Sequence, residues 1–326
     1  MDKPLAPLIE QRADPFIHRH DNGYYFIASV PDYDRLELRH ATTIAGLADA
    51  EPVTIWEKED SGPLSELIWA PELHYHQGSW IVYFAAAPSR DTRDGLFQHR
   101  MYCIATSADD PIQGVWSHPQ RIDTGIDSFC LDGTAFQHGG ELYYVWAQKE
   151  AGIPGNTNLY IARMATPDTL DSAPVRLSIP EFDWETRGFM VNEGPAVLIR
   201  HGRVLLTYSA SATDENYCMG LLWADQSADL LDPASWAKSP SPVFTSDPQR
   251  SVFGPGHNSF TVAEDGTTDM LVYHARPYTD IVGDPLWDPN RHTYVKSIAW
   301  DPDGFPRFGQ PSLEEAPADD EERMTP

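Results

Sequence analysis

The sequence is poor in basic residues, in cysteine and in long apolar runs, and each shortage excludes a class of protein. Only 23 of its 326 residues are Lys or Arg, against 49 Asp or Glu, so the formal net charge is −26. This balance excludes a nucleic-acid partner, because nucleic-acid binding depends on Lys and Arg side chains that neutralise phosphates. The ligand should therefore be neutral or cationic.

The three cysteines and the apolar runs bear on location. Cys103, Cys130 and Cys218 show no metal-type spacing and lie in or beside apolar strand runs, which predicts buried free thiols. No stretch approaches the roughly 18 to 20 apolar residues of a membrane span, and the N-terminus lacks the apolar core of a secretory signal. These absences predict a cytoplasmic protein without a membrane partner; a secreted chain whose signal had been removed would look the same.

No linker divides the chain. The 41% hydrophobic composition is enough for a substantial core. We expect one folded domain over residues 1–312 and an acidic tail over 313–326, whose mixture of acids with Pro and Ala predicts loose order.

What the sequence does contain is a five-fold internal repeat. In each unit a polar residue opens an alternating apolar run, and a turn then leads to a second, more apolar run. The openers are Asp14, Glu72, Asp132, Glu193 and His257, and the paired runs cover 16–29, 73–85, 134–146, 196–209 and 260–274. Further strands are expected at 35–39, 101–106, 159–164, 218–224 and 294–300.

The length of the repeat predicts the architecture. A period of about sixty residues is too long for a solenoid, but it suits a sheet of about four antiparallel strands. Five such sheets predict an all-β, five-bladed β-propeller. The first strand of each propeller blade lines the central channel, so the five openers should converge there.

Three of the openers are carboxylates with special neighbours. Asp14 precedes Pro15, whose ring should hold it in an extended conformation. Asp132 and Glu193 are each followed by a glycine, which would let the backbone approach a ligand. A carboxylate at the head of an apolar strand is costly to desolvate and needs a hydrogen-bonded or catalytic reason; capping of a turn is the structural alternative.

Three acids around one pocket suit glycoside hydrolysis. One protonated carboxyl group gives a proton to the leaving oxygen, and an ionised one activates water or attacks the sugar. A third can tune the acid, because a like charge raises a carboxyl pKa. An ionised Asp132 would therefore help Glu193 to stay protonated.

The ordered set of motifs resembles glycoside hydrolase family 43. The motifs are Ala13-Asp14-Pro15, Trp69-Ala70-Pro71-Glu72, Asp132-Gly133, Asn192-Glu193-Gly194-Pro195, Gly256-His257-Asn258-Ser259 and Tyr273-His274-Ala275-Arg276. The resemblance implies an inverting mechanism with Asp14 as general base, Asp132 as pKa modulator and Glu193 as general acid. The stretch 24–39 is most similar to the exo-acting α-L-arabinofuranosidases of that family.

The resemblance also implies roles for supporting residues. It suggests a hydrated calcium ion in the channel beside His257, although one imidazole with waters would make only a weak, structural site. Arg276 is expected to contact substrate or Asp132, with a strand-end surface charge as the alternative. Trp69 could stack on a furanose ring or pack within its blade. Tyr33 and Phe129 are further candidates for substrate contact; Glu72 has no assigned role.

The expected activity is release of terminal L-arabinofuranose from arabinan or arabino-oligosaccharides, with no cofactor required for the chemistry. A β-xylosidase or an endo-arabinanase of the same family is an alternative. Closure of the channel by loops 87–100 and 148–158 would favour exo action over endo action. A non-catalytic sugar-binding propeller, which would need neither Asp14 nor Glu193 for turnover, is the alternative from another class.

Overall fold

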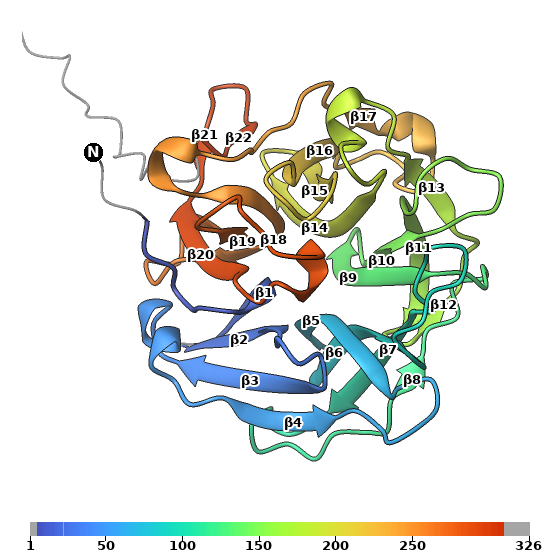
Figure 1. Cartoon of the computed structure of the whole chain (residues 1–326), viewed down its shortest axis with the longest axis vertical. Helices are drawn as coiled ribbons and strands as arrows, with labels where there is room; N and C mark the ends of the chain where they lie inside the picture. Colours follow the sequence, from blue (N-terminus) through green and yellow to red (C-terminus); the bar gives the residue numbers. More distant parts are fainter. Residues whose placement is uncertain (1–4, 22, 310–326) are drawn as a thin grey trace, which may run out of the picture.

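The computed structural model describes residues 5–21 and 23–309, which form a five-bladed β-propeller (Figure 1). Antiparallel sheets follow one another around a central axis in chain order, and the innermost strand of each blade faces that axis. The fold predicted from the repeat is confirmed. The predicted boundary at residue 312 and the acidic tail over 313–326 lie outside the described residues.

The blades are numbered I to V along the chain. Blade I contains β1 (Ala13–His20), β2 (Gly23–Ser29), β3 (Arg35–Ala41) and β4 (Val53–Glu57), and blade II contains β5 (Glu66–His76), β6 (Ser79–Ala87), β7 (Arg100–Thr106) and β8 (Gln120–Arg121). Blade III contains β9 (Cys130–His138), β10 (Glu141–Gln148) and β11 (Asn158–Thr166), with β12 (Thr169–Leu170) and β13 (Val175–Ser178) both paired to β11.

Blade IV contains β14 (Asn192–Arg200), β15 (Arg203–Ala210), β16 (Cys218–Asp225) and β17 (Ala237–Lys238). Blade V contains β18 (Phe253–Val262), β19 (Asp269–Arg276) and β20 (His292–Ser297), and a separate pair, β21 (Ala299–Trp300) with β22 (Pro306–Arg307), follows it. Short 3₁₀ turns are η1 (Ala45–Ala48), η2 (Asp183–Glu185), η3 (Pro233–Ser235), η4 (Pro248–Arg250) and η5 (Pro285–Trp287).

The second strand of each blade is more apolar than the first because both of its faces are covered. In β6 every residue from Trp80 to Ala87 is buried. A sheet packed on both faces by neighbouring sheets requires a continuous apolar run rather than alternation. The paired runs read from the sequence are therefore the first two strands of each blade.

A β-bulge interrupts the innermost strands. In β1 the register shifts between Ala13 and Phe16, and Asp14 between them has a φ of 55°. The prediction that Pro15 holds Asp14 extended is wrong, because the bulge places this residue in the left-handed region instead. Bulges turn a side chain out of the regular alternation, and here they aim it toward the channel.

The bulges also show which residues are equivalent in the five blades. The residues with positive φ at this position are Asp14, Ala70, Asp132, Gly194 and His257. Glu193 comes one residue before this position and Glu72 two residues after it. The prediction that all five polar openers occupy one repeat position is therefore wrong for these two residues, because sequence spacing alone cannot locate a bulge.

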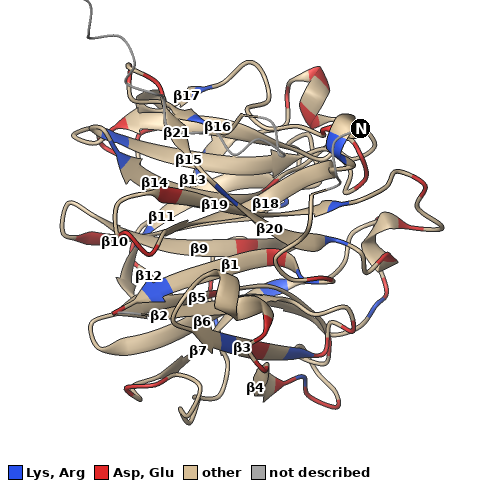
Figure 2. Ribbon diagram, turned by 90° about the vertical axis from the view of Figure 1, so that its left-hand side faces the viewer, with Lys and Arg blue, Asp and Glu red and all other residues tan. Residues whose placement is uncertain are grey.

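The remaining general predictions concern thiols, charge and membranes. Cys103, Cys130 and Cys218 are free and buried, as predicted. Asp and Glu residues are spread over loops on several sides of the molecule, with fewer Lys and Arg residues between them (Figure 2). Among residues 5–21 and 23–309, no helix is long and apolar enough to cross a membrane.

Candidate active site

A cavity of about 250 Å³ opens where the innermost strands of all five blades meet. These strands contribute Asp14 from β1, Trp69 from β5, Asp132 from β9, Glu193 from β14 and His257 from β18 to its wall. The prediction that the five openers converge in the channel is confirmed for Asp14, Asp132, Glu193 and His257 and is wrong for Glu72. Glu72 is not part of this wall; its carboxylate instead lies 2.8 Å from His74 Nε2.

Asp14 is surrounded by groups that stabilise its ionised form. The Ser29 hydroxyl donates to Oδ2 at 2.6 Å, and Arg291 Nη1 lies 3.5 Å from Oδ1. The Nδ1 atoms of His257 and His274 each lie 3.3 Å from the same Oδ1. The side chain is 8% exposed, so these contacts replace most of its hydration.

The charges around Asp14 decide its pKa. Burial opposes ionisation, but His257, Arg291 and His274 outweigh burial and hold the pKa of Asp14 well below its usual range. Burial lowers the pKa of His274 to about 3 and also lowers that of His257. Arg291 is therefore the partner that carries a full positive charge near neutral pH, and Asp14 is a carboxylate there.

The pKa of Glu193 is shifted in the opposite direction to that of Asp14. Burial raises its pKa to about 7, and the nearby charge of Asp14 adds to that effect. The Tyr217 hydroxyl donates to Oε1 at 2.8 Å and opposes the shift, because this bond favours the ionised carboxylate. Glu193 can therefore hold a proton at neutral pH while Asp14 remains ionised, which is the division expected for an acid and a base.

Asp132 is held by the backbone of the strand that carries Glu193. Its Oδ2 accepts the Gly194 backbone N–H at 3.0 Å and lies 3.9 Å from His257 Nδ1. Burial raises the pKa of Asp132, and the charges of Glu193 and Asp14 raise it further. The modulator hypothesis needs an ionised Asp132, whereas the raised pKa favours its protonated form. The modulator role of Asp132 therefore stays a prediction.

The glycines beside the acids make room for protein side chains. A Cβ at Gly133 would overlap the Tyr144 hydroxyl, and one at Gly194 would lie 3.1 Å from His257 Cγ. Gly194 also has a φ of 53°, which a glycine adopts without steric cost. Close packing around the carboxylates, rather than backbone approach to a ligand, accounts for these two glycines.

The predicted substrate-binding residues separate into two groups. Trp69, Phe129 and His257 line the cavity, whereas Tyr33 and Arg276 do not. The Tyr33 hydroxyl accepts from Arg291 Nη2 at 2.9 Å, so it supports the guanidinium that faces Asp14. Trp69 also packs within its blade, because its ring stacks on that of His99 with centroids 3.9 Å apart.

Arg276 contacts the loops around the cavity and does not line the cavity itself. It is 3% exposed and donates to the backbone carbonyls of Thr213 and Pro285, and its Nε lies 3.7 Å from Asp288. These contacts exclude the surface-charge alternative. The expected contact with substrate or Asp132 is not supported either, since Arg276 is absent from the cavity wall and these loop partners hold its guanidinium.

Sequence reasoning missed Arg291 and Tyr217, which line the cavity and contact Asp14 and Glu193 respectively. They share a position: Tyr217 directly precedes β16 and Arg291 directly precedes β20, the third strands of blades IV and V. Alignment of the blades on their third strands would have found both. The five openers lie on the first strands and carry no information on this position.

The described residues do not fit a directly ligated metal ion. Among residues 5–21 and 23–309, no group of three or more His, Cys, Asp or Glu side chains is arranged to share one. The His257 Nδ1 atom is engaged with Asp14 and Asp132. A calcium ion held by His257 through water stays a prediction, and no step below depends on it.

Known proteins resemble the chain over most of its length. It is 51% identical over 306 residues to an extracellular exo-α-(1→5)-L-arabinofuranosidase of Streptomyces avermitilis. The aligned region covers 94% of this chain and 63% of that protein. A protein of the same name from Streptomyces chartreusis is 51% identical, with 86% of this chain and 84% of that protein covered. The chain thus spans less than two thirds of the first relative.

Two further findings concern structure and location. The crystal structure of an α-L-arabinofuranosidase from Lactobacillus brevis has a TM-score of 0.93 and 57% identity, covering 96% of this chain and 98% of that one. The predicted cytoplasmic location is contradicted, because both Streptomyces relatives are named extracellular. The first residues of the chain were therefore no guide to location.

The family is established by the length of the match. A family model described as "Glycosyl hydrolases family 43" matches residues 4–306. This range contains all five blades and every residue of the cavity wall. The chain belongs to glycosyl hydrolase family 43.

Proposed function

We propose that this chain is an exo-acting, inverting α-L-arabinofuranosidase that releases terminal L-arabinofuranose from arabinan or arabino-oligosaccharides. The observation that carries the chemistry is the contrast between Asp14, which is ionised, and Glu193, whose pKa of about 7 lets it hold a proton, in one cavity. The substrate class is supported by the names of relatives that share about half of their residues with this chain.

The reaction follows from the two protonation states. Glu193 gives its proton to the glycosidic oxygen, which leaves as a neutral hydroxyl group. Asp14 takes a proton from water as that water attacks the anomeric carbon from the opposite face, so the configuration inverts. Arg291 keeps Asp14 ionised until attack, and the charge of Asp14 raises the proton affinity of Glu193. Asp132 accepts the Gly194 N–H and so orients the strand that carries Glu193.

The loops that line the cavity support exo action. The connection between β6 and β7 contributes Leu96 and Phe97, and that between β10 and β11 contributes Asn156. The connection before β20 adds Asp284 and Leu286. Walls on several sides favour a pocket that accepts a chain end over a groove that accepts a polymer at any point.

The same relatives support action outside the cell on a neutral arabinose-containing substrate. A neutral substrate suits the cavity, because a further anion would meet the charge of Asp14. The net charge of −26 gives no attraction for polyanions.

The proposal is tested by assaying the purified protein on an aryl α-L-arabinofuranoside, an aryl β-D-xyloside and linear arabinan. We expect hydrolysis of the first, arabinose as the only small product from arabinan, and an inverted anomer as the first product in proton NMR spectra. Preference for the xyloside would indicate a β-xylosidase, and oligosaccharide products from arabinan would indicate an endo-arabinanase. Absence of hydrolysis on all three would leave a sugar-binding propeller.

The pH dependence of kcat/KM should follow the two carboxyl groups. Because Glu193 must be protonated, kcat/KM should fall as pH rises through about 7. Asp14 should cause no loss until well below the ordinary aspartate pKa of about 3.9. Tyr217→Phe removes a bond that favours ionised Glu193, so it should move the alkaline limb to higher pH. An unchanged or lowered alkaline pKa in this variant would contradict the assignment.

A further inference from the structure

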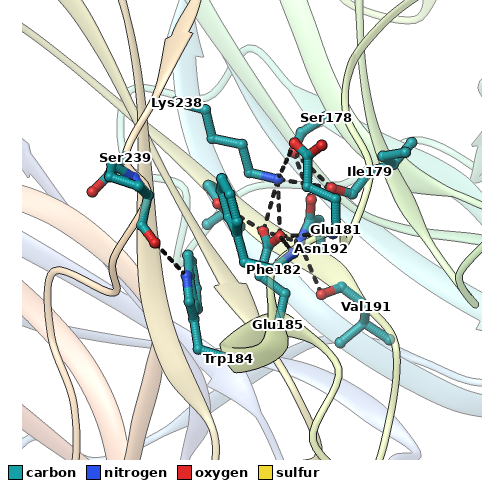
Figure 3. Close-up of polar contacts among 12 residues, drawn as sticks. Ser178, Ile179, Glu181, Phe182, Trp184, Glu185, Val191, Asn192, Lys238 and Ser239 are labelled. Atoms are coloured by element: carbon teal, nitrogen blue, oxygen red, sulfur yellow. Dashed lines mark hydrogen bonds and ion pairs between the residues drawn. The ribbon is translucent and has the colours of Figure 1, made fainter.

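The strongest unexplained feature outside the cavity is a buried polar cluster between blades III and IV (Figure 3). We define the Glu185 cluster as Ser178, Glu185, Asn192, Tyr208 and Lys238. Glu185 and Asn192 are fully buried at 0% exposure. Buried ion pairs contribute little to stability on balance, since desolvation offsets their attraction. The presence of a charged pair here therefore needs another reason.

Every oxygen of Glu185 is engaged. Its Oε1 accepts from Asn192 Nδ2 at 2.9 Å and from the Tyr208 hydroxyl at 2.8 Å. Lys238 Nζ lies 2.9 Å from Oε1 and donates to Oε2 at 3.0 Å. Its Oε2 accepts from the backbone N–H groups of Glu181 and Phe182 at 2.8 and 2.9 Å. The carboxylate is thus fixed in position by its own 3₁₀ turn, η2, and by blade IV.

Asn192 is held at both ends of its amide. While Nδ2 donates to Glu185, Oδ1 accepts from the Ser178 hydroxyl at 2.6 Å, and the Asn192 backbone N–H donates to the Thr157 carbonyl at 3.1 Å. Figure 3 shows these contacts converging on Asn192 from Ser178 and from Glu185. These bonds restrict both the rotation of the Asn192 side chain and the position of its backbone at the start of β14.

The consequence falls on the neighbouring residue. Glu193 follows Asn192 in β14, and side chains of consecutive strand residues point to opposite faces. Asn192 enters the cluster between the blades, so Glu193 faces the cavity, where Tyr217 is its hydrogen-bond partner. The bulge between Glu193 and Ala196 begins directly afterwards. Rotation of β14 at Asn192 would move the Glu193 carboxyl group.

The cluster also reaches a second part of the cavity wall. The Trp184 carbonyl in η2 accepts from the Ser211 hydroxyl at 2.8 Å, and Ser211 in turn accepts the Arg187 N–H at 3.0 Å. Ser211 lines the cavity. The turn that carries Glu185 therefore supports both the strand that carries Glu193 and the part of the cavity wall formed by Ser211.

We propose that Asn192, locked by Ser178 and by the Glu185–Lys238 ion pair, is a positioning residue that aims the proton of Glu193 at the leaving oxygen. This inference rests on the proposed function, in which Glu193 is the general acid. Lys238 pairs with Glu185, and Glu185 in turn holds the orientation of the Asn192 amide. Asn192 itself touches no reacting atom.

The test exploits the dependence of acid catalysis on the leaving group. A leaving group that departs readily as an anion needs little protonation, whereas the hydroxyl group of a sugar needs a well-placed proton. Asn192→Ala should therefore lower kcat by about 100-fold on an arabino-oligosaccharide, as expected for a misplaced catalytic group. On an aryl arabinofuranoside with a strongly electron-withdrawing ring the loss should be about threefold or less. KM should change little on either substrate.

Matched variants separate positioning from folding. Ser178→Ala removes the bond to Asn192 Oδ1 and a long contact of 3.4 Å with the Ile179 carbonyl. It should show the same selectivity with a smaller loss, so it serves if Asn192→Ala does not fold. Arg200→Met breaks the Arg200–Asp269 pair, 2.7 Å long, at the other end of β14 and should change the two kcat values equally or not at all. Thermal unfolding of each variant reports its stability independently.

Equal losses of kcat on the two substrates in Asn192→Ala and Ser178→Ala, or no loss on either, would overturn the positioning role. A wild-type protein inactive on both substrates would instead contradict the proposed function. The two failures are therefore distinguishable within one set of assays.

Discussion

Replacement of the acid, Glu193→Gln, is expected to lower kcat/KM on arabino-oligosaccharides by about 1,000-fold, or about 4 kcal/mol of transition-state free energy. Glutamine keeps the shape of the side chain and can still accept the Tyr217 hydrogen bond seen at 2.8 Å. It cannot donate an acidic proton to the glycosidic oxygen. The measurement is steady-state kinetics with an oligosaccharide and with an activated aryl arabinofuranoside.

The activated substrate is the internal control for this variant. Its loss should be about tenfold or less, because its leaving group needs little protonation. The alkaline limb of the wild-type pH profile should also disappear, since the group that titrates near pH 7 is gone. A loss of equal size on both substrates would contradict the assignment of Glu193 as general acid.

Replacement of the base, Asp14→Asn, is expected to lower kcat/KM by about 1,000-fold on both substrates. Activation of water is required whatever the leaving group, so an activated substrate should bring no recovery. Asparagine tolerates the φ of 55° at this position better than alanine would, and it can keep the Ser29 contact. The buried Arg291 loses its counter-charge, so the variant should also unfold at a lower temperature.

A small anion should restore turnover when Asp14 is shortened. Asp14→Gly fits the positive φ and leaves space beside Arg291 for azide. With an activated substrate, azide should then restore activity and give an arabinosyl azide of inverted configuration, identified by proton NMR. A product of retained configuration would contradict Asp14 as the base of an inverting reaction.

Much of the fold could be predicted from the sequence because blade structure repeats locally. Each blade needs an alternating strand, a turn and a strand buried on both faces, and these patterns recur about every sixty residues. The acids Asp14, Asp132 and Glu193 stood out for the same reason, since each interrupts an apolar strand at nearly the same phase. All three lie in the cavity wall.

The exact phase of the openers could not be predicted. A bulge inserts a residue into one strand and shifts every later position, and no composition rule locates it. Glu72 was therefore counted as a channel carboxylate although Ala70 occupies the equivalent position in β5. The extended conformation predicted for Asp14 failed for the same reason.

Contacts between residues far apart in the chain could not be predicted from the sequence either. Arg291 lies 277 residues from Asp14 in the chain, and only closure of the propeller brings blade V beside blade I. Arg276, singled out by its motif, is turned instead toward the loop carbonyls of Thr213 and Pro285. A guanidinium at the end of a strand can reach either destination, and the packing of the loops decides.

By itself the sequence determined the propeller, the family and the three acidic residue types, because these follow from local patterning that each blade repeats. Only the tertiary structure decided which acid holds a proton. Arg291 approaches Asp14 from another blade, whereas Glu193 is buried beside Tyr217 and within reach of the charge of Asp14. A carboxyl pKa depends on burial and on charges within a few ångströms, and in this chain residues from distant blades supply them.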